Sequence, residues 1–170
     1  RAAPPAKRYQ RPMNILITGG AGFIGVHLAR AHLGRGDAVV LIDNLFKTQG
    51  AGDPEWQALL AHPAARWVRH DLTQPLPAAE LPGGTFDLVY HLAAINGTQL
   101  FYDIPYEVAR TNVLSTIHLL DALARCQVGR LIYSSTSEVY ADAVAIDRCP
   151  IPTDEQVPVV FTQPTHVRFS

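Results

Sequence analysis

Three glycines follow a short apolar run near the start of the chain. The run covers residues 15–17 (ILI), and its β-branched residues are typical of a strand that is buried on both faces. Gly19, Gly22 and Gly25 then stand three residues apart. This spacing predicts a tight turn into a helix that begins near Phe23, where backbone N–H groups can approach a phosphate without a side chain between them. The segment therefore predicts a binding site for a pyrophosphate.

Two acidic residues close the next two predicted strands. The first strand covers residues 38–42 (AVVLI) and ends at Asp43, which lies 18 residues after Gly25. Dinucleotide-binding folds place a carboxylate roughly 20 residues after the glycines, where it accepts a hydrogen bond from the adenosine ribose. Because a carboxylate repels a 2′-phosphate, Asp43 favours NAD over NADP. Asp71 ends a strand over residues 66–72 and could meet adenine; an ordinary loop aspartate is the alternative.

The elements that must position these residues alternate between strand and helix. Further strands are predicted over residues 86–92 and 130–135, and helices from residue 23 to a stop at Gly34, over residues 54–60 and over residues 106–126. This alternation predicts an α/β fold, a Rossmann-type doubly wound parallel sheet with helices on both faces. From residue 141 onward the chain is Pro-rich and without periodicity, which predicts either a substrate-facing loop or a chain that stops short of its next element. We expect a flexible extension at residues 1–12 and one NAD-binding domain at residues 13–170.

Composition limits the classes of function. The 170 residues suit a single core, and 48% hydrophobic with 17% charged residues is ordinary for a globular protein. A net charge of -1 gives no electrostatic case for binding nucleic acid. No apolar run approaches the roughly 18 residues of a membrane span, and no signal-peptide core precedes the first strand. We expect a cytoplasmic protein with no nucleic-acid or membrane partner, free thiols at Cys126 and Cys149, and no metal site.

Six short motifs together resemble the extended short-chain dehydrogenase/reductases. They are TGGAGFIG (residues 18–25), Asp43-Asn44, Asp71-Leu72, HLAA (91–94), TNV (111–113) and SSTSEVY (134–140), in the family's order and spacing. Within that family the chain looks like the NAD-dependent nucleotide-sugar epimerases, dehydratases and decarboxylases. The resemblance covers residues 13–140 and implies NAD as the cofactor.

The resemblance also implies which residues bind NAD. The glycine turn would hold the pyrophosphate, Asp43 and Asn44 the adenosine ribose, and Asp71 with Leu72 the adenine. The implied set is Gly19, Gly22, Phe23, Ile24, Gly25, Asp43, Asn44, Asp71, Leu72, Leu92, Ala93, Ala94, Asn112 and Ser134. Position alone suggests candidates for the substrate side, which are Asn96, Thr98 and Phe101.

Two residues of the SSTSEVY motif are the implied catalytic residues. Thr136 matches the family's catalytic Ser/Thr, whose hydroxyl would hydrogen-bond the sugar oxygen that becomes a carbonyl as hydride leaves for NAD. Glu138 is the second candidate, with an ordinary surface residue as its alternative. The run Thr-Ser-Glu resembles that of UDP-glucuronate decarboxylases, and Ser137 counts against a hexose 4,6-dehydratase. Epimerisation stays open.

The family's Tyr-x-x-x-Lys pair does not occur in this sequence. Lys7 and Lys47 are the two lysines, and neither has a tyrosine four residues before it. Tyr140 is therefore not the acid/base, whose pKa of about 10 a neighbouring ammonium would lower. The family often carries an arginine three residues before that tyrosine, so Arg168 predicts the tyrosine directly after Ser170, with the substrate domain beyond it.

These observations predict an enzyme that modifies a nucleotide-activated sugar, of the UDP-sugar class, through a transient keto-sugar. Thr136 would assist a tyrosine base beyond the chain, and the full-length protein would be a homodimer. A non-catalytic NAD-binding or sensor module is the alternative. A tyrosine directly after Ser170 and a lysine four residues later would support the enzyme, and other residues there would favour the sensor.

Overall fold

The computed structural model describes residues 11–47, 53–81, 84–146 and 149–160. The chain forms two compact units, Arg1–Tyr133 and Ser134–Ser170, which are considered separately. Residues 1–10 of the expected extension, and Arg168 with its two following residues, lie outside the described ranges. Arg11, the first described residue, forms an ion pair with Asp87.

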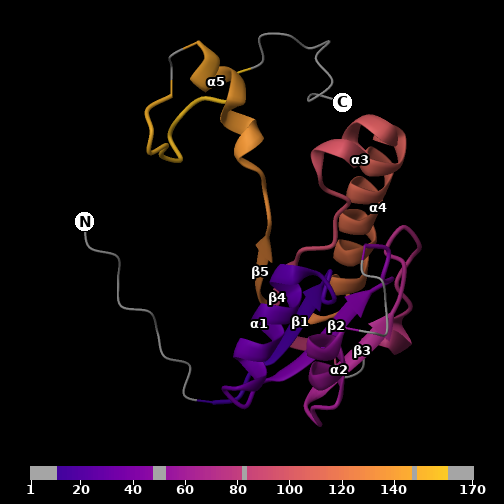
Figure 1. Cartoon of the computed structure of the whole chain (residues 1–170). Coiled ribbons are helices and arrows are strands. Elements are labelled where there is room, and N and C mark those ends of the chain that lie inside the picture. Colours follow the sequence, from indigo (N-terminus) through magenta and orange to yellow (C-terminus); the bar gives the residue numbers. More distant parts are fainter. Residues whose placement is uncertain (1–10, 48–52, 82–83, 147–148, 161–170) are drawn as a thin grey trace. The chain divides into compact units, whose positions relative to one another are not determined.

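The first unit is built on a five-stranded parallel sheet (Figure 1). Its strands are β1 (Asn14–Thr18), β2 (Ala38–Asp43), β3 (Ala65–Arg69), β4 (Thr85–His91) and β5 (Gln127–Tyr133). They lie in the order β3-β2-β1-β4-β5, and every neighbouring pair is parallel. The order reverses between β1 and β4, where open α/β sheets place their ligands. The predicted doubly wound sheet is confirmed.

The helices of this unit are α1 (Phe23–Leu33), α2 (Pro54–Leu60), α3 (Thr98–Asp103) and α4 (Pro105–Leu123), with a short 3-10 helix at Ala78–Glu80. Three of these helices were predicted and α3 was not. α2 begins as predicted, because the Asp53 side chain accepts the Glu55 N–H at 2.8 Å and Pro54 needs no N–H donor there. None of the helices that the structure describes has the length and hydropathy required to cross a bilayer.

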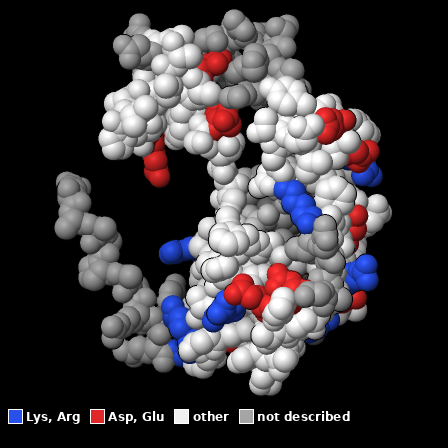
Figure 2. Space-filling view, viewed as in Figure 1, with Lys and Arg blue, Asp and Glu red and all other residues white. Residues whose placement is uncertain are grey.

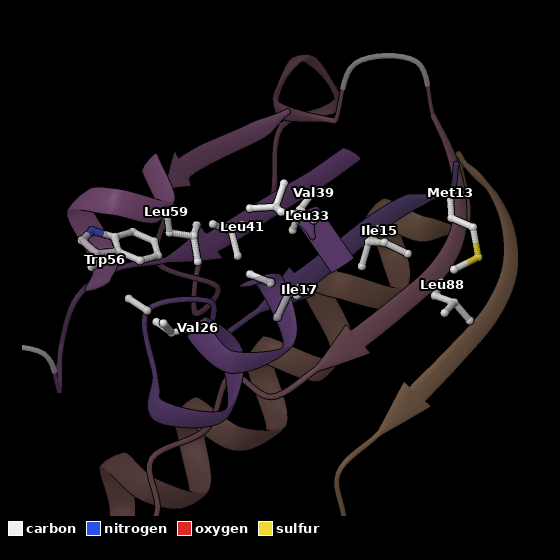
Figure 3. Close-up of a cluster of buried hydrophobic side chains, with 12 residues drawn as sticks. Met13, Ile15, Ile17, Val26, Leu33, Val39, Leu41, Trp56, Leu59 and Leu88 are labelled. Carbon is white, nitrogen blue, oxygen red and sulfur yellow. The ribbon is translucent and has the colours of Figure 1, made fainter. Parts of the chain in front are cut away.

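The central strand β1 is buried on both faces. Ile15 and Ile17 pack into one apolar cluster with α1 and α2, which includes Val26 and Trp56 (Figure 3). Leu16, between them, points into a second cluster that contains residues of α4. Successive strand residues point to opposite faces, so helices on both sides of the sheet require the uninterrupted apolar run that the sequence has.

The second unit begins directly after β5. A 3-10 helix η2 (Ser137–Tyr140) leads into a short helix α5 (Ala141–Ala145). The expected loop is therefore wrong at its start, because residues 141–145 (ADAVA) contain three alanines, which favour helix. Cys126 of the first unit and Cys149 of the second are free thiols.

A buried, hydrogen-bonded carboxylate joins the end of α1 to the start of β2. Asp37 is 1% exposed and accepts hydrogen bonds from the Met13 N–H at 2.9 Å and from His32 Nδ1 at 2.7 Å. Burial raises the pKa of Asp37, but these two hydrogen bonds and the charges of His32 and Arg35 outweigh burial and hold the pKa below its usual value. His32 Nε2 lies 3.1 Å from the hydroxyl of Tyr90. The carboxylate is thus charged in the folded protein.

We predict that Asp37→Ala lowers the free energy of unfolding by about 3 kcal/mol, because Met13 and His32 lose a buried partner. In the wild type, the lowered pKa means that this contribution is complete above a pH of about 4 and is lost as the pH falls through the folded-state pKa. Urea unfolding at neutral and acidic pH measures both effects. The control is Asp121→Ala on the exposed side of α4, which should change stability by less than about 0.5 kcal/mol. Equal losses in the two variants would contradict the prediction.

Candidate functional site

A pocket of about 660 Å³ opens at the carboxyl ends of β1, β2 and β4. Backbone and side chains from the segments after these strands form its walls. The predicted residues that line it are Gly19, Gly22, Phe23, Ile24, Gly25, Asp43, Asn44, Asp71, Leu72, Leu92, Ala93, Ala94 and Asn96. Residues far apart in the sequence therefore meet at one site, at the switch point of the sheet.

The glycine turn lies directly against the segment that follows β4. Gly19 has a φ of +70°, and a Cβ atom there would lie 2.8 Å from the Ala93 nitrogen and 2.8 Å from the Leu92 carbonyl carbon. A Cβ on Gly25 would overlap the Gly19 carbonyl oxygen. Both positions require glycine, because only backbone fits between these segments. The two loops are thereby held in contact at the pocket wall.

The amino end of α1 faces the pocket without a capping side chain. Gly22 is the N-cap residue, and no acidic residue occupies the first turn. The Val26 N–H makes the first helical bond, to the Gly22 carbonyl at 2.9 Å. The three amides before it, at residues 23–25, have no acceptor within the helix. These donors and the positive end of the helix dipole can bind an anion in the pocket.

Asp43 holds the glycine turn to the end of β2. Its Oδ2 accepts the Ala21 N–H at 3.0 Å, and its Oδ1 accepts the Leu45 N–H at 2.7 Å. A carboxylate has about four acceptor positions, so it can accept further hydrogen bonds from a ligand. Sequence reasoning predicted only a ligand contact, since no local pattern shows that Asp43 reaches Ala21. The same side chain thus shapes the pocket and lines it.

Asp71 lies in the loop that follows β3, which ends at Arg69 rather than at Leu72. Burial raises the pKa of Asp71, but hydrogen bonds from Thr73 and Asn44 and the nearby charge of His70 outweigh burial and lower the pKa. Its Oδ1 accepts the Thr73 N–H at 2.8 Å. Asp71 is therefore an ionised acceptor at the β2–β3 side of the pocket.

A lysine that sequence reasoning did not assign bridges two pocket loops. Lys47 Nζ donates to both the carbonyl and the side-chain oxygen of Asn96. Burial lowers the pKa of Lys47. The sequence offered one indication that Lys47 lines the pocket, which is its position four residues after Asp43. The pocket residues that were not assigned from sequence are Ile42, Phe46, Lys47, His70, Thr73, Ile95, Ile104, Glu107, Arg110, Thr111 and Ser115.

Several predicted site residues lie outside the pocket lining. Asn112 of α4 supports the wall from behind, since its Oδ1 accepts the Ile95 N–H at 2.8 Å and its Nδ2 donates to the Ile95 carbonyl at 3.0 Å. Thr98 and Phe101 lie on α3 and do not line the pocket. The remaining predicted residues, Ser134, Thr136 and Glu138, belong to the second unit. There the Thr136 hydroxyl accepts the Glu138 N–H at 3.2 Å.

Charges of both signs occur on the face of the molecule that Figure 2 shows. The pocket itself combines the carboxylates of Asp43, Asp71 and Glu107 with the cations Lys47 and Arg110. Such a mixed lining suits a ligand that carries both anionic groups and hydroxyl donors. The residues that the structure describes include no group of three His, Cys, Asp or Glu side chains that could hold a metal ion.

The glycine contact predicts a difference between two substitutions. Gly19 and Gly36 both have a positive φ, but a Cβ on Gly36 would meet no atom within 4 Å. Gly36→Ala should therefore cost only the backbone strain of about 1–2 kcal/mol. Gly19→Ala should lower the free energy of unfolding by more, because the Cβ also pushes against residues 92–93. Urea unfolding of both variants measures the difference. Equal costs would show that the loop contact is not tight.

The walls of the pocket fit a dinucleotide. The amides at the start of α1 and the glycines at residues 19, 22 and 25 suit a pyrophosphate, and a carboxylate at the end of β2 suits a ribose hydroxyl. Small residues Ala93 and Ala94 leave the backbone after β4 open to a flat ring.

The chain is similar in sequence to one curated protein and in sequence and fold to two solved structures. UDP-glucuronic acid decarboxylase 6 of Arabidopsis thaliana is 37% identical over 139 residues, which are 81% of this chain and 37% of that protein. A solved NAD dependent NDP-hexosamine 5,6-dehydratase of tunicamycin biosynthesis is 32% identical, with a TM-score of 0.69 over 89% of this chain and 45% of its own. UDP-glucuronic acid 4-epimerase from Bacillus cereus, solved with a fluorinated UDP-glucuronic acid and NAD, is 34% identical, with a TM-score of 0.65 over 75% and 41%.

The chain thus spans less than half the length of each of these three proteins. The sequence model of the NAD dependent epimerase/dehydratase family matches residues 15–165. This match covers most of the chain, including every segment that lines the pocket. The chain belongs to the NAD-dependent epimerase/dehydratase family.

Proposed function

We propose that the protein is an NAD-dependent enzyme that modifies a nucleotide-activated sugar, of the UDP-sugar class, through a transient keto-sugar. The observation that carries the proposal is the pocket in which the free amides of α1 and the Asp43 carboxylate face the same space. The decarboxylase and the epimerase compared above are named for UDP-sugars. Because the chain spans less than half the length of the proteins compared above, the activity is proposed for the whole protein.

Each wall of the pocket takes one part of the cofactor. The amides at residues 23–25 bind the pyrophosphate, Asp43 and Asn44 bind the adenosine ribose, and Asp71 with Leu72 flanks the adenine. Leu92, Ala93 and Ala94 line the path to the nicotinamide, and Asn112 supports them through Ile95. When bound, NAD supplies a hydride acceptor.

The hydroxyl of Thr136 would act on the sugar. β5 is parallel to β1, so the chain leaves β5 after Tyr133 at the same sheet edge at which the pocket opens. Thr136 follows three residues later, with Ser134 proposed to contact NAD and Glu138 proposed to act beside Thr136. A hydroxyl can donate a hydrogen bond to the sugar oxygen as that oxygen becomes a carbonyl. The sugar hydroxyl loses its proton in this step, and a tyrosine base outside this sequence would accept that proton.

The candidate activities, decarboxylation and epimerisation, differ in the reaction that follows oxidation of the sugar. Identity to UDP-glucuronic acid decarboxylases and the Thr-Ser-Glu run at residues 136–138 favour decarboxylation, and the epimerase neighbours keep epimerisation as the alternative. The test incubates the whole protein and NAD with UDP-glucuronic acid and with UDP-hexoses, follows NADH absorbance and identifies products by NMR. A UDP-pentose or a sugar epimer is the expected product. NAD binding without NADH or product from any UDP-sugar would favour the non-catalytic sensor.

We further propose a cytoplasmic homodimer. Tyr106, Val113, Ile117 and Leu120 form an exposed apolar stripe along α4, since they recur at helical spacing and each is at least 47% exposed. A second copy of the protein would remove this stripe from water. Sedimentation of the whole protein measures the oligomeric state.

The Asp43 geometry predicts two separable effects. Asp43→Ala should weaken NAD binding by roughly tenfold or more, because a charged acceptor and the anchor of the glycine turn are both lost. Asp43→Asn keeps one acceptor oxygen and should lose less NAD affinity. Both variants should bind NADP better relative to NAD, since the charge that repels a 2′-phosphate is gone. Calorimetric titration with the two dinucleotides measures this ratio, and an unchanged ratio in both would remove Asp43 from the ribose site.

For the proposed catalytic hydroxyl, Thr136→Ala should reduce kcat by about 100-fold or more and leave the Kd for NAD within about twofold. Thr136→Ser is the matched control, because it keeps both the hydroxyl and an acceptor for the Glu138 N–H; it should retain most activity. Steady-state kinetics of the whole protein measures these values. Full activity in Thr136→Ala would exclude this residue from the mechanism.

A further inference from the structure

A buried histidine connects three elements behind the cofactor pocket. His91, the last residue of β4, is 4% exposed and does not line the pocket, whereas the five residues after it do. Its Nδ1 lies 2.7 Å from the hydroxyl of Thr18 at the end of β1, and its Nε2 lies 3.0 Å from the hydroxyl of Thr116 on α4. The imidazole therefore joins the two central strands to the long helix at the pocket edge.

The hydrogen bonds around Thr18 determine which atom is the donor in the contact between Thr18 and His91. Thr18 Oγ1 accepts the N–H groups of Leu92 and Ala93, each at 3.2 Å; the Leu92 N–H is shared with the Thr18 carbonyl. A hydroxyl has two acceptor positions and one proton. Among the described residues, His91 Nδ1 is the acceptor within reach of that proton. His91 Nδ1 must then be unprotonated.

The other side of the ring completes a one-way chain of donors. With Nδ1 unprotonated, Nε2 carries the proton and donates it to Thr116 Oγ1. The Thr116 hydroxyl in turn donates to the Asn112 carbonyl at 3.0 Å. The Asn112 side chain holds both the N–H and the carbonyl of Ile95. Thr18 thus holds the first residues of the pocket segment 92–95, and Asn112 holds its last.

The surroundings of His91 favour the neutral ring. Besides Thr18 and Thr116, the ring of Tyr133 on β5 also faces His91, with ring centroids 5.5 Å apart. No carboxylate or cation contacts His91 within the part of the chain that the structure describes. Burial lowers the pKa of His91. An imidazolium would direct a second N–H at Thr18 Oγ1, whose acceptor positions are occupied.

We propose that His91, as the neutral Nε2–H tautomer, is a positioning residue that holds the backbone of residues 92–95 in the shape that binds the dinucleotide. This inference rests on the proposed function. A displacement of this backbone would also affect the glycine turn. The two segments are in close contact, because a Cβ on Gly19 would lie 2.8 Å from the backbone of residues 92–93. A shift after β4 therefore disturbs two walls of the pocket.

The test compares two buried histidines. His91→Leu removes both hydrogen bonds at the pocket edge. His32→Leu removes a buried, hydrogen-bonded histidine in the last turn of α1, whose partners are Asp37 and Tyr90 and do not line the pocket. We expect His91→Leu to raise the Kd for NAD by roughly tenfold, the loss that corresponds to about one hydrogen bond. His32→Leu should lower the melting temperature and leave the Kd within about twofold.

A second measurement uses only the wild-type protein, so it does not require that any variant folds. In ring-15N-labelled wild-type protein, NMR at neutral pH should show His91 as the Nε2–H tautomer. The Nδ1–H tautomer or an imidazolium would overturn the inference, as would an unchanged Kd for NAD in folded His91→Leu. A wild type that binds no NAD would instead overturn the proposed function, so the two failures are distinguishable.

Discussion

A requirement for bare backbone at the carboxyl edge of the sheet underlies the candidate site. Gly19 lies against the backbone of residues 92–93, and Gly25 lies against Gly19, with no room for a Cβ atom at either glycine. This contact brings the amino end of α1 beside the segment after β4. Asp43 then fixes the turn through the Ala21 N–H. The anion-binding end of a helix, a carboxylate and a flat backbone wall thereby share one pocket.

The two proposed tasks, cofactor binding and proton transfer, fall on different segments of the chain. β1, β2 and β4 end at the pocket and supply the residues proposed to hold the cofactor. β5 ends at the same edge, and the chain then enters the second unit with Thr136 and Glu138. We propose that the earlier segments bind the dinucleotide and that the later segment carries the proton-transfer groups. The two solved structures compared here share the fold of this chain, with TM-scores of 0.69 and 0.65.

Sequence reasoning succeeded where the signal is local. The apolar run at residues 15–17, the glycine spacing and the Asp53 cap predicted β1, α1 and α2, because period, turn chemistry and capping act over a few residues. It missed α3 and the Lys47–Asn96 bridge, and it gave Asp43 only a ligand role. The His91 connection was missed for the same reason as the bridge. These features depend on side chains that meet only after the sheet has formed.

The most direct test of this account is a crystal structure of the protein with NAD. The account predicts the pyrophosphate at the amides of residues 23–25 and the adenosine ribose within hydrogen-bond distance of the Asp43 carboxylate. It also predicts the nicotinamide beside residues 92–94, with the His91 hydrogen bonds intact. A dinucleotide bound elsewhere, or one whose ribose does not contact Asp43, would contradict it.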